Sequence, residues 1–524
     1  MQQMHQQKKH KEDIKNSVGR LLFVGIAIIL QLLWFALVVL RINQHYLIVS
    51  ILTRIVTVGA VLGIFGRHTN ATVKLSWIFL ILAVPILGLL LYLLSIRSNF
   101  VKTMQKRFAA IDDTLFRELP ANDAVLSRLR ELDPGIANQA YFLKHSAGFP
   151  TYQNTDVTFY GDAWEGLEAQ KEELRRAKKF IFMEYHAIED AEAFGGIKEI
   201  LAGKAREGVE VRVFYDDIGS VGFLNASFIR EMEELGIACR VFNPIVPIVN
   251  LFMNNRDHRK ITVIDGRVGF TGGYNLANEY FNLCHPYGHW KDSGIRLEGE
   301  AVQTLTVLFL EMWNAMERAN AESAADMNIR KYLPDIHYQA HEDGFVIPFG
   351  DSPMDETHTG EDVYLNLIQN AKRYVYIMTP YLIITDDMIR ELTLAARRGV
   401  DVRIITPGIP DKKMIYHTTR SYYNALVRHG VRIYEYTPGF CHAKQVAADD
   451  ELAVIGTINF DYRSLYHHFE DAVVLYKYDC IKAIRADFEE SFRVSEEVTE
   501  KYNTGRSTAL RIGHCILRLC APML

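Results

Sequence analysis

Two stretches of this chain carry the same polar residues at the same spacing. In each stretch a His is followed by Lys, Asp, Gly and Asn, and the Asn lies 17 residues after the His. A single copy would be weak evidence, because short polar patterns arise by chance. Two copies in register indicate the two halves of one active site. The first copy is His258, Lys260, Asp265, Gly272 and Asn275, and the second is His442, Lys444, Asp449, Gly456 and Asn459.

The His-x-Lys pair suits chemistry on an anionic group such as a phosphate. Residues two apart on a β-strand share one face, so the imidazole and the ammonium would reach the same point. Lysine can hold phosphate oxygens while histidine attacks phosphorus or donates a proton. The Asp265-Gly266 pair is typical of a hairpin turn, whereas Asp449-Asp450 is a less distinctive one.

A metal site is the competing interpretation, because histidine is abundant in this chain. Lysine is a poor partner for such a site, however, and the sequence has neither an HExxH motif nor a cysteine cluster. We therefore expect no metal and no other cofactor. The six cysteines are scattered, which is typical of a protein in a reducing compartment.

A long internal repeat surrounds the two motifs. Residues 177–183 resemble residues 371–377, and residues 205–213 resemble residues 396–404. Each repeat has an apolar β-rich run, a helix ending near Gly208 or Gly399, and another apolar run. Strands that alternate with helices predict an α/β fold with a substantial parallel sheet.

The repeat spacing reveals an insertion in the first half. Gly236 and Gly430 are 194 residues apart, but the two motif histidines are only 184 apart. About ten extra residues, Asn243 to Met253, therefore precede the first motif, and they are strongly apolar. We expect either a partly buried loop or an apolar lip that contacts lipid.

Three apolar segments lie in the first hundred residues. Residues 21–40 and 75–96 carry no charge, and each is long enough to cross a bilayer core of roughly 30 Å. The segment 46–66 contains Arg54, so we expect it not to cross. Basic residues flank the two uncharged segments on their outer sides, which predicts two spans and a cytoplasmic catalytic part. Three spans would place that part outside.

These features together resemble the phospholipase D superfamily, and within it the bacterial cardiolipin synthases. The resemblance rests on the paired apolar segments and on residues 255–260, 272–280, 290–292 and 456–464. It implies an α/β fold of two pseudo-twofold-related halves with mixed β-sheets flanked by helices, after N-terminal transmembrane helices. The implied parts are a membrane anchor (1–98), a linker helix (99–140), and phospholipase D-like halves at 141–330 and 331–524.

The resemblance also implies roles for the motif residues. His258 is the expected nucleophile that forms a phosphohistidine, and His442 is the expected acid and base. Asp292 and Glu470 would orient the histidines. The pair His467-His468 differs from the residues that are common in the family at these positions, and it has no assigned role. Phosphate charge would be stabilised by Lys260, Lys444, Asn275 and Asn459. Asp265 and Asp449 belong to the catalytic motifs, but they lie at predicted turns, so their role could be structural.

The function implied is synthesis of cardiolipin and glycerol from two phosphatidylglycerols at the bacterial cell membrane. Expected partners are phosphatidylglycerol and other membrane phospholipids. A transferase or hydrolase with another donor or acceptor is the main alternative. A nuclease is disfavoured by the net charge of -5, and a non-catalytic scaffold by the intact motifs. The sequence leaves donor selectivity and oligomeric state open.

Overall fold

The chain forms two compact units in the computed structural model. The small unit contains residues 1–103, 245–254 and 508–524, and the large unit contains residues 104–244 and 255–507. The structure describes residues 47–67, 69–96, 99–120, 122–225, 227–244, 255–316, 329–336, 338–503 and 508–523, with isolated positions between 29 and 41. The apolar insertion after Pro244 therefore lies outside the described residues.

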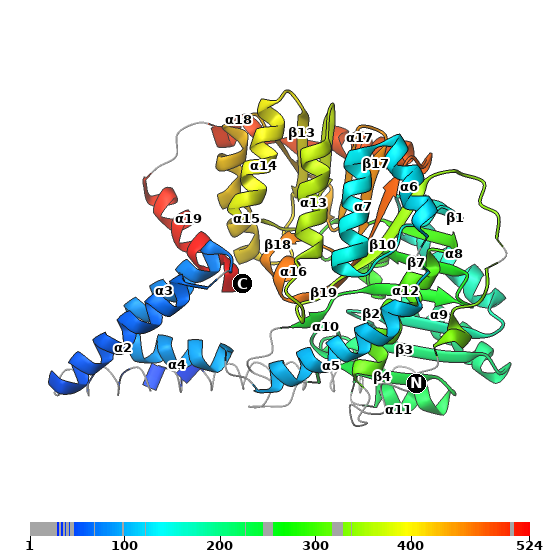
Figure 1. The fold of residues 1–524 in the computed structure, drawn as a ribbon, viewed down its shortest axis with the longest axis horizontal. Helices are drawn as coiled ribbons and strands as arrows, with labels where there is room; N and C mark the ends of the chain where they lie inside the picture. Colours follow the sequence, from blue (N-terminus) through cyan, green and yellow to red (C-terminus); the bar gives the residue numbers. More distant parts are fainter. Residues whose placement is uncertain are drawn as a thin grey trace. The chain divides into compact units, whose positions relative to one another are not determined.

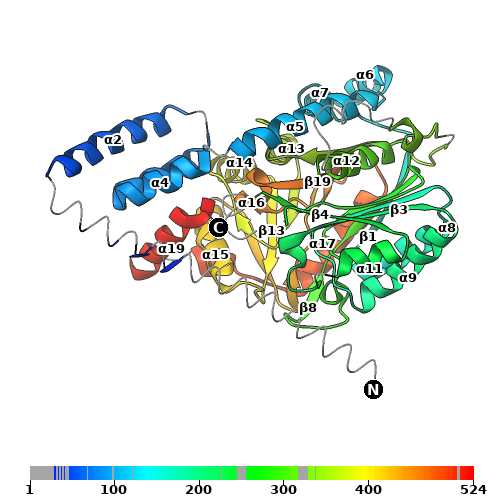
Figure 2. The same cartoon turned by 90° about the horizontal axis from the view of Figure 1, so that it is seen from below.

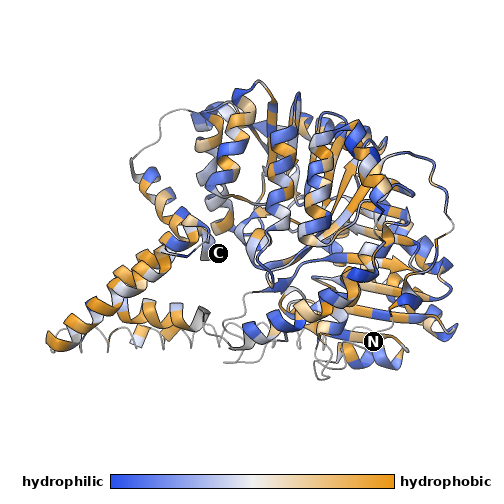
Figure 3. Cartoon of the chain, viewed as in Figure 1, coloured by the Kyte–Doolittle hydropathy of each residue, from blue (hydrophilic) through white to orange (hydrophobic). Residues whose placement is uncertain are grey.

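The described part of the small unit consists mainly of helices, and three of them are hydrophobic along most of their length (Figure 3). These are α2 (Leu47–Phe65), α3 (Ala71–Ala83) and α4 (Pro85–Ile96), and the C-terminal segment adds α19 (Thr508–Cys520) and η5 (Ala521–Met523). The hydroxyl of Ser76 in α3 donates to the carbonyl of Leu519 in α19 over 2.7 Å.

The predicted segment 75–96 is not one helix, which corrects the expectation from the sequence. It divides at Val84, because Pro85 has no N–H to continue the hydrogen bonding of α3. The lack of a side chain at Gly88 lets the two helices meet, since a Cβ there would lie 2.7 Å from Ile81 Cα. Within the described ranges, no helix combines the length and apolar character needed to cross a membrane. Most of the predicted span 21–40 lies outside those ranges.

The predicted linker helix is also divided. The structure has α5 (Asn99–Leu115), η1 (Phe116–Glu118), α6 (Asp123–Leu132) and α7 (Pro134–Ala147). Asn122 caps α6 by accepting from the N–H of Val125, and Asp133 caps α7 in the same way. Pro134 follows as the first residue of α7, a position that needs no N–H donor.

The first half of the large unit is built on a seven-stranded sheet with the order β1-β9-β7-β6-β2-β3-β4. Strands β2, β3 and β4 are parallel, and the remaining pairs are antiparallel. The bounds are β1 (Thr155–Tyr160), β2 (Phe180–Tyr185), β3 (Glu210–Asp216), β4 (Ala238–Phe242), β6 (Lys260–Ile264), β7 (Val268–Gly272) and β9 (Gly294–Gly299).

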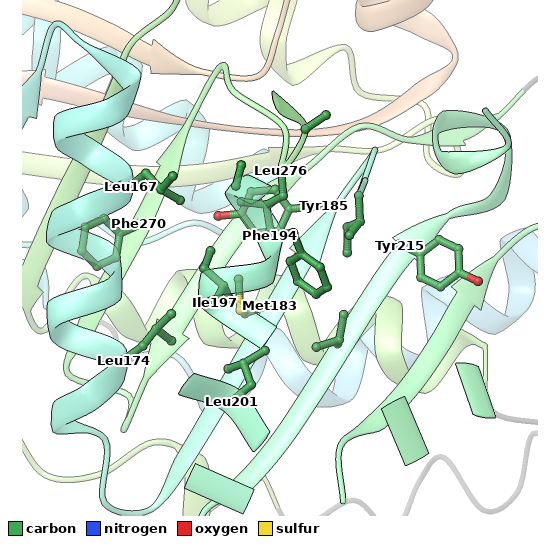
Figure 4. Close-up of a cluster of buried hydrophobic side chains, with 14 of the residues drawn as sticks. Leu167, Leu174, Met183, Tyr185, Phe194, Ile197, Leu201, Tyr215, Phe270 and Leu276 are labelled. Carbon is green, nitrogen blue, oxygen red and sulfur yellow. The ribbon is translucent and has the colours of Figure 1, made fainter. Parts of the chain in front are cut away.

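Helices cover both faces of this sheet. Figure 2 shows α8 (Ala163–Arg176), α9 (Glu192–Arg206) and α11 (Phe228–Glu234) on one side and α12 (Val302–Ala315) on the other. Every residue of β2 is buried, as expected for a strand covered on both faces. Leu167 and Leu174 of α8 and Phe194 and Ile197 of α9 pack around Met183 in this core (Figure 4).

The second half repeats the architecture. Its sheet has the order β10-β19-β17-β16-β11-β13-β14-β20, in which the first seven strands correspond one by one to those of the first sheet. The strands are β10 (Phe345–Asp351), β11 (Tyr374–Met378), β13 (Asp401–Pro407), β14 (Arg432–Tyr436), β16 (Gln445–Ala448), β17 (Leu452–Gly456), β19 (His468–Tyr476) and β20 (Ser495–Glu497). The helices are α13 (Thr359–Asn370), α14 (Asp386–Arg397), α15 (Lys413–Val427), α16 (Tyr462–Tyr466), α17 (Cys480–Arg493) and α18 (Thr499–Asn503), labelled where room allows in Figure 1.

The duplicated glycines behave as the sequence predicts. Gly208 and Gly399 follow the last turns of α9 and α14 with φ angles of +89° and +91°. This left-handed conformation ends a helix at little cost only when the residue has no Cβ. The α/β class and the two mixed sheets flanked by helices are therefore confirmed.

Two short strand pairs join the halves. Strand β5 (Arg256–Asp257) runs parallel to β19 of the second half. Strand β8 (His289–Lys291) runs parallel to β15 (Gly439–Cys441). His258 directly follows β5, and His442 directly follows β15. The junction of the halves therefore positions both motif histidines. Smaller elements are α10 (Asp217–Ser220), η2 (Asn278–Phe281), η4 (Arg330–Tyr332), β12 (Leu382–Ile383) and β18 (Phe460–Asp461).

Candidate active site

The backbone of each motif histidine is held by the opposite half of the protein. The N–H of His258 donates to the carbonyl of Phe469 over 2.9 Å, and the N–H of His442 donates to the carbonyl of Lys291 over 2.7 Å. We expected His258 and Lys260 on one continuous strand, but the strand is interrupted between β5 and β6. The reason is that β5 pairs with the second half, whereas β6 pairs within the first.

The two predicted orienting carboxylates contact the histidines across the same junction. Glu470 Oε2 lies 2.8 Å from His258 Nδ1, and Asp292 Oδ2 lies 2.7 Å from His442 Nδ1. Each half therefore supplies the carboxylate for the histidine of the other half. All four side chains are buried, and a carboxylate at Nδ1 leaves Nε2 as the reactive nitrogen of a neutral ring.

Burial dominates the electrostatics of both histidines. It lowers the pKa of His442 to about 4, with the Lys444 ammonium acting in the same direction and Asp292 opposing. Burial also lowers the pKa of His258 well below its usual range. Both rings are therefore neutral at neutral pH in the free site.

The two carboxylates differ in charge. Burial raises the pKa of Glu470 well above its usual range, although Lys260 opposes it. Burial acts in the same direction on Asp292, but His442 and Lys444 hold the pKa of this carboxyl below its usual range. The His442 side of the site thus holds a firmly ionised carboxylate, and the His258 side does not.

Both motif lysines are almost completely buried beside their histidines. Lys260 Nζ donates to the carbonyl of His258 over 2.7 Å. Lys444 Nζ lies 2.8 Å from Nδ1 and 2.9 Å from Nε2 of His442 and also donates to its carbonyl. Because Nδ1–H is committed to Asp292, Nε2 is the ring atom that can accept from Lys444. Burial lowers the pKa of Lys444 to about 7, so this ammonium gives up a proton readily.

The two motif asparagines have different surroundings. Asn275 Oδ1 accepts from the N–H of Ala187 over 3.1 Å, and its Nδ2 donates to the hydroxyl of Tyr280 over 2.8 Å. Asn459 is buried, and its Oδ1 has no hydrogen-bond partner among the residues that the structure describes. Their predicted contact with phosphate stays a prediction.

The motif aspartates lie at the far end of their strands. Asp265 accepts from the N–H groups of Lys178, Lys179 and Phe180 over 2.7–3.0 Å. Asp449 makes the equivalent contacts at the start of β11 over 2.6–3.0 Å. The five residues of β6 put Asp265 about 16 Å from the reacting end. This position suits a structural role, the second of the two readings that the sequence left open.

Close approach of the backbone explains the motif glycines. A Cβ on Gly272 would lie 2.5 Å from the carbonyl oxygen of Ser293, and one on Gly456 would lie 2.3 Å from that of Asp471. No side chain fits at either position. Strand β9, which follows Asp292, can therefore lie directly against β7, and strand β19, which carries Glu470, can lie directly against β17.

Sequence reasoning missed several residues that support the site. Arg259 is fully buried between the halves, where it donates to Glu311 over 2.8 Å and to the carbonyl of Glu470 over 3.2 Å. Its position between His258 and Lys260 could have identified Arg259 from the sequence. His186 Nδ1 lies 2.6 Å from the carbonyl of Asp257, and its ring centroid is 5.0 Å from that of His258. No sequence signal pointed to His186.

One group within the site could hold a metal ion. Ligand atoms of His258, His468 and Glu470 all lie within 4.8 Å of one another. Lys260 is close enough to shift the pKa of all three, so its ammonium would repel a divalent cation placed there. The expected independence from metal stays a prediction.

Comparison with known proteins places the duplicated halves in a family. Residues 171–313 and 364–492 match the family described as cardiolipin synthase, PLD-like domain, and residues 55–97 match one described as Phospholipase_D-nuclease N-terminal. The chain belongs to the cardiolipin synthase-like branch of the phospholipase D superfamily. It is therefore a phospholipase D-like enzyme of the cardiolipin synthase family, as its sequence motifs predicted.

Relatives cover nearly the whole chain. An uncharacterized protein of Streptococcus mutans is 40% identical over 467 residues, which is 89% of this chain and all of that protein. A cardiolipin synthase of Halalkalibacterium halodurans is 32% identical over 91% of this chain and 93% of its own length. The phosphatidylserine synthase of Haemophilus influenzae shares the fold, with a TM-score of 0.55 and 15% identity over 74% of this chain and 99% of that one.

Proposed function

We propose that this protein is a cardiolipin synthase that transfers a phosphatidyl group between two phosphatidylglycerols and releases glycerol. The observation that carries the proposal is the pair of buried histidines, each held at Nδ1 by a carboxylate and flanked by a buried lysine. The names of the relatives support the choice of substrate.

In the first step His258 Nε2 attacks phosphorus, and the bond from phosphorus to the headgroup glycerol breaks. His442 donates a proton to the departing glycerol oxygen, so neutral glycerol leaves and a phosphatidyl-His258 remains. His442 is neutral in the free site, but a bound phosphodiester anion raises the pKa of the ring. Lys444, close to Nε2, is a suitable source of that proton.

In the second step His442 takes a proton from a hydroxyl of the second phosphatidylglycerol. That oxygen forms the new bond to phosphorus, and the bond to His258 Nε2 breaks. Asp292 steadies the His442 cation in both steps, as a carboxylate does in a catalytic triad. Lys260, Lys444, Asn275 and Asn459 stabilise the charge that moves between the phosphate oxygens.

The site acts on lipid at the bacterial cell membrane. The match of residues 55–97 to a phospholipase D N-terminal family supports membrane association, as do the exposed apolar side chains of α2. Leu47 and Ile48, for example, are 76% and 74% exposed, which is costly in water.

The experiment is the lipid product spectrum of the purified full-length protein in phosphatidylglycerol vesicles. We expect cardiolipin and glycerol by mass spectrometry, without CTP or CDP-diacylglycerol and in the presence of EDTA. Because the two phosphodiesters are alike, the exchange is nearly balanced, and excess glycerol should suppress cardiolipin. A variant lacking both His258 and His442 is the control.

Three results would contradict parts of this proposal. Phosphatidic acid as the main product would make the protein a hydrolase. Cardiolipin formed only with CDP-diacylglycerol would show a different donor. Loss of activity in EDTA that only zinc or magnesium restores would show that the site needs a metal.

A further inference from the structure

Arg259 lies between His258 and Lys260, and all three residues bind β19 of the second half. His258 and Lys260 do so through main-chain N–H groups, which donate to the two residues that flank Glu470. Arg259 does so through its side chain, whose Nε donates to the carbonyl of Glu470 over 3.2 Å. Every residue except proline offers a main-chain N–H, so among these three contacts only that of Arg259 depends on the type of side chain.

The guanidinium of Arg259 also binds helix α12 of the first half. Its Nη1 donates to Glu311 Oε2 over 2.8 Å and to the carbonyl of Leu308 over 3.0 Å. The side chains of Arg259 and Glu311 are only 1% and 3% exposed. One buried side chain therefore connects α12 of the first half to the main chain of Glu470 in the second half.

A glycine leaves room for this guanidinium. Gly350 lies on β10, which pairs with β19. A Cβ on Gly350 would lie 3.1 Å from Arg259 Nη2 and 2.7 Å from Leu308 Cδ2. A larger residue at this position would therefore displace the guanidinium or the leucine side chain.

The stability of the fold gives little reason for an ion pair at this place. Two buried charges lose their hydration, and apolar side chains of similar volume are often equally or more stabilising. Apolar side chains cannot, however, donate to the carbonyl of Glu470. The guanidinium therefore indicates that the position of Glu470 matters.

The position of Glu470 matters because its carboxyl group contacts the expected nucleophile. Glu470 Oε2 lies 2.8 Å from His258 Nδ1, and this contact orients the imidazole ring. Thr457 Oγ1 donates to the same carboxyl oxygen, which holds the carboxyl group but not the main chain that carries it. A shift of this main chain by about 1 Å would misplace the ring, and such a misplacement typically costs about a hundredfold in rate.

The second motif lacks the side chain for such a connection. Its residue at the corresponding position is Ala443, whose N–H donates to the carbonyl of Lys291 over 3.2 Å. The methyl group of alanine has no donor for the main chain of Asp292. The side-chain connection is therefore specific to the motif of His258, the residue expected to attack phosphorus.

We propose that Arg259 is a positioning residue that, together with Glu311, holds Glu470 in place and thereby orients His258 for attack on the phosphodiester. The inference rests on the proposed phosphatidyl transfer, in which His258 is the nucleophile. In this role Arg259 acts through Glu470 and makes no contact with the reacting atoms. The rate at which the bond between His258 Nε2 and phosphorus forms should therefore depend on Arg259 more strongly than substrate binding does.

Arg259→Lys in the full-length protein tests the proposal. Lysine keeps the positive charge beside Glu311, but its single nitrogen cannot occupy the positions of both Nε and Nη1. We expect rapid-quench mass spectrometry with phosphatidylglycerol vesicles to show that phosphatidyl-His258 forms about a hundredfold more slowly, with little change in KM.

Arg212→Lys is the matched control, because it makes the same substitution at another largely buried arginine of the first half. Arg212 contacts Glu210 at the start of β3 and the hydroxyl of Tyr332 in η4, and neither residue lies on β19. This variant should form phosphatidyl-His258 at the wild-type rate.

A double variant separates positioning from stability. Arg259→Met combined with Glu311→Leu removes both charges of the pair, so neither is left buried without the other. Its thermal unfolding should be close to that of the wild type, while phosphatidyl-His258 should still form slowly. A double variant that is as stable and as fast as the wild type would overturn the proposal. An Arg259→Lys variant in which KM rises while the first step keeps its rate would overturn it as well.

The chemical reactivity of His258 separates this inference from the proposed function, because it needs no lipid substrate. Diethyl pyrocarbonate modifies neutral imidazole rings, and peptide mass spectrometry gives the ratio of the modification rates of His258 and His442 in the same molecules. Arg259→Lys should raise this ratio several-fold, because the ring of His258 is no longer held in its buried position, and Arg212→Lys should leave the ratio unchanged.

The two outcomes are then distinguishable. A raised ratio in Arg259→Lys of a protein that makes no cardiolipin would reject the function and leave the role of Arg259 standing. An unchanged ratio in Arg259→Lys, together with cardiolipin synthesis at the wild-type rate, would leave the function standing and reject the role of Arg259.

Discussion

At the scale of single residues, two histidines with identical motifs have different surroundings. His258 lies beside two other histidine rings and a carboxyl whose pKa burial raises. His442 lies among aromatic rings and faces Asp292, whose pKa is lowered. An ionised carboxylate stabilises a protonated histidine ring, and Asp292 offers one to His442. The roles of the two histidines should therefore be unequal.

His258→Ala should abolish the covalent phosphatidyl-enzyme, because it removes the attacking nitrogen. His442→Ala should slow turnover by about a thousandfold or more and still permit some adduct, since only proton transfer is lost. Intact-protein mass spectrometry after acid quenching of a reaction with phosphatidylglycerol measures both. An adduct that maps to His442 would reverse the assignment, and no adduct in any variant or the wild type would favour direct displacement.

The contact of His442 with a carboxylate of the other half predicts how the pH dependence of turnover changes in a variant. Asp292 counteracts the effect of burial on His442, so Asp292→Asn should lower the pKa of His442 further. The limb of the kcat profile that His442 controls then moves to lower pH, and turnover falls by about a hundredfold or more.

Glu470→Gln is the matched comparison for Asp292→Asn, because Glu470 contacts His258. It should slow the reaction without moving the limb that His442 controls. A limb that moves with Glu470→Gln and stays in place with Asp292→Asn would contradict the pairing across the junction.

At the scale of elements, the motif aspartates connect a turn to the start of a strand. Asp265 and Gly266 have φ angles of +55° and +68° in the turn between β6 and β7, which the N–H of Arg267 closes by donating to the carbonyl of Ile264 over 3.1 Å. The Asp265 carboxylate also accepts three N–H groups where β2 begins. Asp449 does the same for β11, which makes each aspartate a brace between neighbouring strands.

Asp265→Ala should lower the free energy of unfolding by about 1–3 kcal/mol, because three backbone donors lose a charged acceptor. Asp265→Asn should cost less, since asparagine keeps an acceptor and tolerates the left-handed conformation. Turnover per folded molecule should change little in either variant. Denaturant unfolding and kcat measure the two effects, and a large loss of kcat at unchanged stability would show a catalytic role instead.

At the scale of the whole molecule, the site exists only where the two halves meet. Each half contributes a histidine and the carboxylate for the other histidine, and two parallel strand pairs hold this arrangement. Neither half alone contains both a motif histidine and the carboxyl group that contacts its Nδ1. The duplication is therefore a requirement of the proposed chemistry, and both halves must lie on the same side of the membrane.

That side should be the cytoplasm, because basic residues flank the predicted spans on their outer sides. Single cysteines placed after Leu40 and after Arg107 can be tested with an impermeant thiol reagent in intact cells. We expect labelling after Leu40 and protection after Arg107, with lysed cells as the control for reactivity. Labelling after Arg107 in intact cells would put the active site outside and support three crossings.

The sequence alone determined the motifs, the repeat and the Asp265-Gly266 turn, because these depend on local spacing and backbone preference. It could not determine which carboxylate meets which histidine. His258 and Glu470 are 212 residues apart, and His442 and Asp292 are 150 apart. The parallel pairing of β5 with β19 and of β8 with β15 decides both contacts. The lack of a hydrogen-bond partner for His468 Nε2 among the described residues is likewise a property of tertiary structure, since only packing shows which polar atoms are buried.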